Sequence, residues 1–255
     1  MHKLIWKKDI LAEIYTWKSA LWLLLTALIY SVTCYLLLTN KELSLLDQTE
    51  MLWLLGKIII GASLLVAIID ASSLITTEFE QETIEDLFLS PLPVRDFILG
   101  KFLTVMSVWA LMYAVAVPYV LVSSAGSNLS AVFLAYAALY GTLLIAGFTV
   151  LVFGLSFLYR SFKNTLTTSL VLFLAAGIPA LFAATLKTGI VASVITAINP
   201  LDAAFASLDN VLVDYHASLS ANWPYLLSIL GFSAAAGVFL FVSVRIFEKR
   251  GVIKE

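Results

Sequence analysis

The chain has 255 residues, of which 61% are hydrophobic and only 13% carry a formal charge, with a net charge of −2. Charged residues make up roughly a quarter of an ordinary soluble domain, so this composition excludes a soluble globular protein. The mean hydropathy of +0.99 predicts instead that apolar residues form long runs that cross a membrane.

Residues 1–19 place Trp6, Ile10 and Trp17 at helical spacing among four lysines. This pattern predicts a helix that lies in the membrane interface. Glu13 interrupts its apolar face, so a plain basic flank that fixes the topology is the alternative.

Six apolar runs follow, and each reaches or exceeds the roughly 20 residues that cross a hydrocarbon core of about 30 Å. They predict spans at residues 20–38, 51–76, 102–124, 130–159, 165–186 and 224–247. No short apolar stretch with a cleavage site precedes them, so we expect the first span to direct insertion. Its lone cysteine, Cys34, is interpreted as an ordinary apolar residue. The fourth span is dense in small residues such as Gly147 and Gly154, which predicts close helix packing.

Two ionisable residues, Lys57 and Asp70, lie inside the second predicted span. Charge inside a membrane is costly and therefore marks a possible functional site. Lys57 is near the outer end of the span and can extend its amine to the surface, while Asp70 is about two turns from the cytoplasmic end, where water can reach it. The two are roughly 20 Å apart along a helix and cannot pair in one straight span.

The connection between the second and third spans is acidic. Its acidic side chains fall on one helical face and its apolar side chains on another, which predicts a short amphipathic helix over residues 78–89. The acidic members of that face are Glu78, Glu82 and Glu85. Ser90-Pro91-Leu92-Pro93 ends the helix and predicts a new one beginning near Val94. Either the segment docks on a basic cytosolic partner, or it is a solvated face of an ordinary loop helix.

The connection before the last span, residues 187–223, is long and is interrupted by Asn199-Pro200. Its apolar stretch is too short for a span. We predict two short helices that dip into or rest on the outer leaflet.

Cations fall almost entirely on one side of this arrangement. Twelve are assigned to one side: Lys3, Lys7, Lys8, Lys18, Arg95, Lys101, Arg160, Lys163, Arg245, Lys249, Arg250 and Lys254. Only Lys41 and Lys187 are assigned to the other. Because basic loops stay on the cytoplasmic side, both termini are predicted to be cytoplasmic, in the plasma or inner membrane.

The sequence has no signature of catalysis. Gly56-Lys57 and Gly100-Lys101 lack the preceding glycine and the following Ser or Thr of a phosphate-binding loop. His2 and His216 lie near opposite ends of the sequence, without a metal-binding or nucleophilic spacing. We predict no catalytic, metal or cofactor site in this chain.

The stretch from Glu78 to Pro91, followed by Arg95 and Gly100-Lys101, resembles the signature of ABC exporter permeases of the second type. That signature is an acidic pair, then Gly-Thr-Leu-Glu or similar, then Leu, then Ser/Thr-Pro, and a Gly-Lys entering the third span. This sequence has Glu82 where the family usually has glycine. The resemblance extends over nearly the whole chain, through the basic interfacial helix, the six spans and the long outer loop with Asn199-Pro200-Leu201.

The resemblance implies that the acidic helix is a coupling helix seated on a separate ABC ATPase, that two permeases pair, and that Mg-ATP on the ATPase drives export. The ATPase-coupling residues carried over by position are Glu78, Glu80, Glu82, Thr83 and Glu85, with Ser90 and Pro91 as the turn. We therefore predict an all-α, homodimeric permease subunit for a hydrophobic or amphipathic drug, peptide or lipid-like substrate. Membrane lipid is the other expected partner, and nucleic acid is not one. A membrane scaffold that recruits a cytosolic regulator and a secondary transporter are the alternatives.

Overall fold

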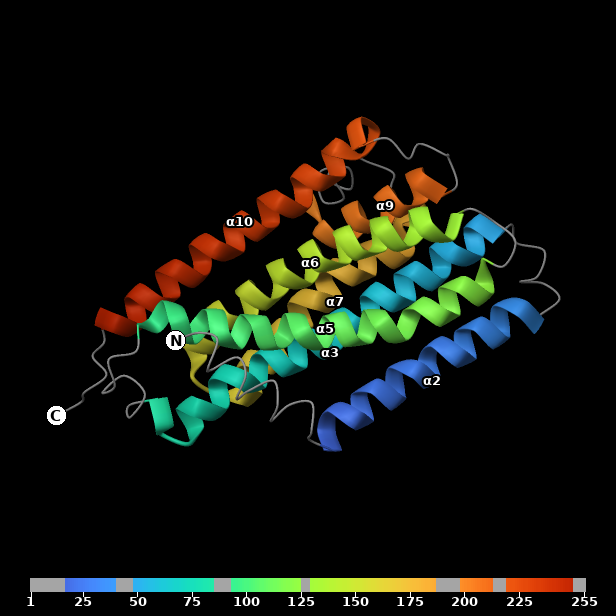
Figure 1. Cartoon of the computed structure of the whole chain (residues 1–255). Coiled ribbons are helices and arrows are strands. Elements are labelled where there is room, and N and C mark those ends of the chain that lie inside the picture. The colour runs from blue at the N-terminus through green and yellow to red at the C-terminus, as the bar shows by residue number, and fades with distance from the viewer. Residues whose placement is uncertain are drawn as a thin grey trace.

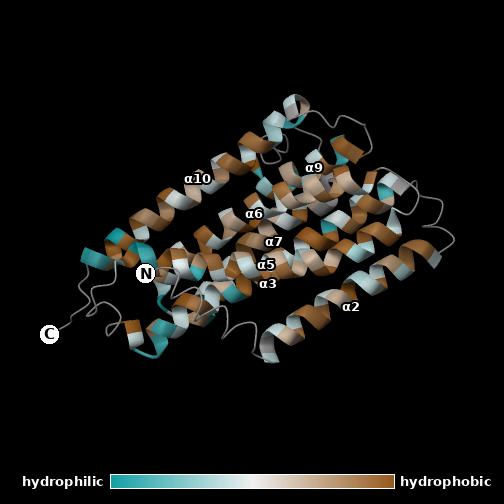
Figure 2. Cartoon of the chain, in the orientation of Figure 1, coloured by the Kyte–Doolittle hydropathy of each residue, from teal (hydrophilic) through white to brown (hydrophobic). Residues whose placement is uncertain are grey.

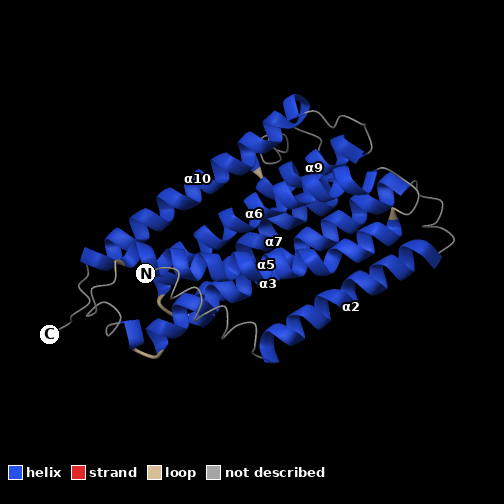
Figure 3. Ribbon diagram, viewed as in Figure 1, coloured by secondary structure: helices blue, strands red, loops and turns tan. Residues whose placement is uncertain are grey.

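The computed structural model describes residues 17–39, 48–84, 93–124, 129–186, 198–212 and 219–249. Within these ranges the chain is helical with short turns, and no residue lies in a strand (Figure 3). The predicted interfacial helix lies outside the described residues except for residues 17–19, which form the first turn of α2 rather than a separate helix.

Six of the described helices overlap the predicted spans in sequence, and one further helix lies in the connection before the last of them. They are α2 (Trp17–Thr39), α3 (Gln48–Glu80), α5 (Val94–Ser123), α6 (Leu129–Tyr159), α7 (Phe162–Leu186), α9 (Pro200–Leu212) and α10 (Leu219–Lys249). Most extend a few residues beyond the apolar runs, because a helix satisfies its own backbone hydrogen bonds and need not end where the apolar residues end.

Five of these helices, α2, α3, α5, α6 and α10, are long and apolar enough to cross a membrane. The chain is therefore a multi-pass α-helical membrane protein. The fifth predicted span corresponds to α7, which is not among the five found over the described residues. The side chains of residues 181–186, at the apolar end of α7, lie outside the described part of the chain. The count of six spans stays a prediction.

Helices α3 and α6 form the centre of the bundle, and α2 and α10 lie at opposite edges of it (Figure 1). The most apolar windows of α3 and α6 are 56% and 67% buried, against 22% for α2 and 17% for α10. Hydrophilic residues gather near the two ends of the helices, while apolar residues dominate their length (Figure 2). This distribution is the one expected of helices whose outer faces contact lipid.

Close packing of α6 on its neighbours confirms the role predicted for its small residues. A Cβ atom added at Gly154 would lie 2.6 Å from Cδ1 of Phe239 and 3.3 Å from Cα of Leu240, both in α10. At Gly147 it would lie 2.7 Å from Oγ of Ser233, also in α10. These contacts are within one chain, so this small face packs α6 against α10.

Helix α9 lies inside the bundle and not on its surface. It contacts α3, α6, α7 and α10, and most of its side chains are buried. Asn199 caps its N-terminus by accepting a hydrogen bond from the backbone N–H of Leu201 at 3.1 Å, and Pro200 occupies the first helical position, where its missing N–H costs nothing. The Asn199 amide also donates to the Ala176 carbonyl of α7 at 2.7 Å. The prediction for this connection was two short helices that dip into or rest on the outer leaflet. Residues 200–212 form one helix that is buried among four others, and its position relative to the leaflet stays a prediction. Residues 187–197 and 213–218 lie outside the described ranges.

Around the acidic connection, the predicted end of the second span is wrong and the predicted start of the next helix is confirmed. Helix α3 does not end at Thr76 but continues to Glu80, because nothing between them breaks a helix. The separate helix predicted to begin at Glu78 is therefore wrong at its start. Helix α5 begins at Val94, as predicted, directly after Pro93 in extended conformation.

Candidate functional site

The candidate site is the junction where α3 ends and α5 and α7 begin. These three helix termini lie at one end of the bundle, which α10 also reaches with its C-terminus (Figure 1). At 33 residues, α3 is about 50 Å long, well above the roughly 30 Å of a hydrocarbon core. Its last turns therefore have the length to reach beyond the apolar layer.

A part-buried ion pair joins α3 to α5. The Lys101 amine donates to Oε1 of Glu78 at 2.9 Å, and the two side chains are only 5% and 22% exposed. The second oxygen of Glu78, Oε2, accepts a hydrogen bond from the Thr83 hydroxyl at 2.6 Å. A carboxylate that accepts from both a cation and a hydroxyl is well compensated for its burial. Glu78 therefore links α3, α5 and the connecting segment.

Glu80 joins α3 to α7. Its Oε1 accepts a hydrogen bond from the backbone N–H of Phe162 at 2.8 Å. Phe162 is the first residue of α7, where backbone N–H groups have no partner within the helix. A carboxylate at a helix N-terminus is also favoured by the helix dipole. Glu78 and Glu80 thus bind different helices although they are two residues apart.

The turn after α3 places Glu82 in the left-handed region, with φ of 59°. Its backbone N–H donates to the Phe79 carbonyl at 3.2 Å, as at a helix C-terminus that ends in this conformation. Glycine adopts such a φ without the strain that a side chain brings. The position where the ABC permease family usually has glycine therefore has the backbone of a glycine in this chain. The Glu82 side chain is exposed.

Three aromatic rings pack beside this turn. Phe79 of α3, Phe157 of α6 and Phe247 of α10 have centroids 5.5 to 5.8 Å apart. The guanidinium carbon of Arg160 lies 5.0 Å from the centroid of Phe247, within the range of a cation–π contact. The rings hold the ends of α3, α6 and α10 together and give the junction a rigid base.

The structure separates the predicted coupling residues into three groups. Glu78, Glu80 and Thr83 make contacts within the chain, and Glu82 is at the exposed turn. Because Glu78 is in α3 and Glu82 is in the turn, they do not share one helical face as predicted. Glu85, Ser90 and Pro91 lie outside the described residues.

The partners that hold these residues were not predicted as site residues. Lys101 was predicted only as one of twelve cations on one side and as part of a Gly-Lys pair, and Phe162 gave no sequence signal because it contributes a backbone N–H. A lysine directly before an apolar run and close to an acidic stretch was the signal that could have found the Lys101–Glu78 pair.

The two charged residues of the second span differ in environment. The Lys57 amine lies 3.5 Å from the ring centroid of Trp53, one turn before it, which fits a lysine near a membrane surface. Asp70 is only 2% exposed and is therefore buried within the bundle. This differs from the prediction that water reaches it. Over the described part of the chain, no group of three or more His, Cys, Asp or Glu side chains is placed to hold a metal ion.

No model of a known protein family matches the chain. No curated protein matches it either. The resemblance to ABC permeases therefore stays a prediction from the sequence motif.

Proposed function

We propose that this chain is the permease subunit of an ATP-driven exporter and that the junction at the end of α3 receives the movement of a separate ATPase. The permease works as a homodimer with two copies of that ATPase, has both termini in the cytoplasm and exports a hydrophobic or amphipathic substrate. Mg-ATP is hydrolysed on the partner subunit, since this sequence has no phosphate-binding loop.

The observation that carries this proposal is the set of bonds from one short acidic stretch to several helices. Glu78 binds Lys101 of α5 and Thr83 of the connecting segment, and Glu80 binds the first N–H of α7. A push on residues 81–84 would therefore reach α3, α5 and α7 together, because the bonds and the aromatic rings leave little freedom between them. A coupling element needs this mechanical connection.

The exposed tip of the junction provides the contact surface for the partner. Glu80, Gln81 and Glu82 are exposed. Of the two carboxylates, Glu80 already accepts the Phe162 N–H, whereas Glu82 makes no ion pair with a described residue. An exposed carboxylate on a rigid turn suits a basic groove, where charge complementarity governs partner choice.

The first test is to purify the tagged chain from its native membranes in mild detergent and to identify the protein that copurifies in stoichiometric amount. We expect an ATPase with a phosphate-binding loop that hydrolyses Mg-ATP. A chain that comes alone, or with a signalling protein, would contradict the proposal, and the signalling protein would favour a membrane scaffold.

The second test is a matched pair of variants at Glu82. Glu82→Lys reverses the charge, and we expect recovery of the ATPase to fall by about tenfold, the factor that corresponds to about 1.4 kcal/mol. Glu82→Gly removes the charge but suits the φ of 59°, so its loss should be smaller and its thermal stability at least that of the natural chain. Equal recovery with Lys and with Glu at this position would show that the acidic tip does not contact the ATPase.

Burial of Asp70 favours a second candidate, a secondary transporter driven by an ion gradient. That function predicts transport in vesicles without ATP and its loss in Asp70→Asn. Under the exporter proposal, transport stops without ATP whether or not Asp70 is changed.

A further inference from the structure

A pocket of about 480 Å³ lies between the first turns of α5 and the last turns of α10. Both helices pack on α6, and the pocket is the space between them on that side. It lies at the same end of the bundle as the junction and includes the first residues of α5, but it contains none of the residues that make the ion pair, hydrogen bonds and ring contacts of the junction. Its lining extends along α10 from Gly237 to Glu248, a length of about 16 Å at 1.5 Å per residue.

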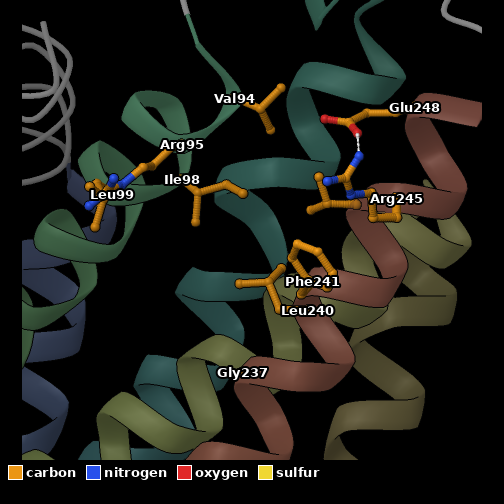
Figure 4. Close-up of a pocket in the computed structure, with 10 residues that line it drawn as sticks. Val94, Arg95, Ile98, Leu99, Gly237, Leu240, Phe241, Arg245 and Glu248 are labelled. Carbon is orange, nitrogen blue, oxygen red and sulfur yellow. Dashed lines mark ion pairs between the residues drawn. The ribbon is translucent and has the colours of Figure 1, made fainter.

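The charged side chains lie on two sides of the pocket, Arg95 on α5 and Arg245 with Glu248 on α10, and the Arg95 guanidinium points away from Arg245 (Figure 4). The rest of the lining is apolar. Ile98 of α5 and Leu240 and Phe241 of α10 supply the apolar part. Its charged groups are Arg95, Arg245 and Glu248, all within the first turn of α5 or the last turns of α10. An occupant that fills this space must be charged at one end and apolar along its body.

The charged end has a net positive charge, from two guanidinium groups against one carboxylate. The Arg245–Glu248 contact is 3.8 Å long and its side chains are 61% and 46% exposed, so this pair is weak. The guanidinium of Arg245 also lies over the Phe241 ring, 5.2 Å from its centroid, which orients it beside the apolar wall. Arg95 is exposed. Both guanidinium groups thus keep N–H donors for an anion, and their planar geometry suits phosphate oxygens.

The apolar wall faces lipid. Phe241 is 61% exposed and lies about one turn from Arg245, deeper along the same helix. Arginines at the ends of spanning helices lie at the level of lipid headgroups. Two other occupants fit this surface less well. A water-soluble anion would make no contact with the apolar wall. A second copy of this chain, related by a two-fold axis, would place the arginines of both copies close together, where their like charges repel.

We propose that this pocket binds an anionic phospholipid from the leaflet at this end of the bundle. Arg245 binds the phosphate from α10, the exposed Arg95 side chain turns towards it from α5, and one acyl chain lies along Ile98, Leu240 and Phe241 towards Gly237. The site does not depend on the proposed export function, because its charges and apolar wall are separate from the junction.

The test uses the purified full chain in detergent with dioleoylphosphatidylglycerol or dioleoylphosphatidylcholine added. Bound lipid is counted by native mass spectrometry, and the thermal unfolding midpoint is measured in parallel. We expect phosphatidylglycerol, and not phosphatidylcholine, to be retained and to raise the midpoint. In the double variant Arg95→Gln with Arg245→Gln, phosphatidylglycerol should bind about thirtyfold more weakly, since each cation near a membrane surface contributes a factor of roughly five.

The matched control is Lys163→Gln, which removes an exposed cation at the same end of the bundle but on α7, outside the pocket. It should bind phosphatidylglycerol as the natural chain does. Glu248→Gln adds no bulk and makes the pocket more positive, so it should bind about threefold more tightly, and this result does not depend on the arginine variants folding. Gly237→Leu should weaken binding by filling the deep end, where a Cβ meets no atom within 4 Å.

Equal retention of the two lipids would overturn the proposal. So would a loss in Lys163→Gln as large as in the arginine variant, since that would mean a diffuse charge effect. If the arginine variant changed the oligomeric state while phosphatidylglycerol binding persisted, the surface would be an interface between copies and not a lipid site.

Discussion

Glu78 and Lys101 are 23 positions apart in the sequence and form a part-buried ion pair, in which the lysine is almost fully buried and the carboxylate is 22% exposed. Such a pair contributes little over an apolar pair of the same shape, but removing one partner leaves a charge without compensation. The ion pair therefore serves mainly to fix the end of α3 against the start of α5, and adds little to the free energy of unfolding. The Thr83 bond to Glu78 brings the connecting segment into the same arrangement.

We expect Lys101→Met to lower the free energy of unfolding by about 3 kcal/mol, because the Glu78 carboxylate loses its cation. The double variant with Glu78→Gln should be less destabilised than the sum of the single variants by about 1 kcal/mol or more. Denaturant titration in mixed micelles, arranged as a double-mutant cycle, measures both. Additive effects would mean that the two side chains do not interact.

Among the elements, α6 decides how closely the bundle packs. It contacts α3, α5, α7, α9 and α10, and its glycines face both α5 and α10. At Gly141, an added Cβ would lie 2.8 Å from the Trp109 ring of α5. Since a membrane gives no hydrophobic driving force between helices, close packing of this kind is a main source of stability.

Gly154→Ala should therefore destabilise the protein by about 1–3 kcal/mol, because the new methyl group must displace Phe239 or move the backbone of α10. The control is Gly231→Ala in α10, where an added Cβ has no atom within 4 Å. That change should be neutral or stabilising by up to about 1 kcal/mol. Thermal unfolding in detergent compares the two, and equal midpoints would show that α6 and α10 are not in close contact at Gly154.

For the whole molecule, the open question of topology is whether α7 spans the membrane. Six spans place both termini on one side, and five place them on opposite sides. Helix α7 contacts α3, α6 and α9 inside the bundle, which favours a span even though its first turns are polar.

We expect reporters fused to the N-terminus and to the C-terminus both to be cytoplasmic, because twelve cations are assigned to that side and two to the other. An epitope inserted between residues 190 and 191 should be accessible from outside the cell, like one inserted between residues 126 and 127. If the epitope at 190 is accessible only from the cytoplasm, α7 does not span and the topology has to be revised.

The sequence by itself determined where the helices lie and where several of them begin. Apolar runs long enough to cross a membrane and a proline pair before Val94 are local properties, so the positions of the helices and the start of α5 were predictable. The acidic stretch after the second span was also identified as the most informative part of the chain.

Only the tertiary structure decided which faces and partners these helices use. The helices are apolar towards both protein and lipid, so no periodic pattern tells the buried face of α3 from an outward face. For the same reason the burial of α9, the burial of Asp70 and the pairing of Glu78 with Lys101 were not predicted. They depend on contacts between residues far apart in the sequence, which local composition and spacing do not specify.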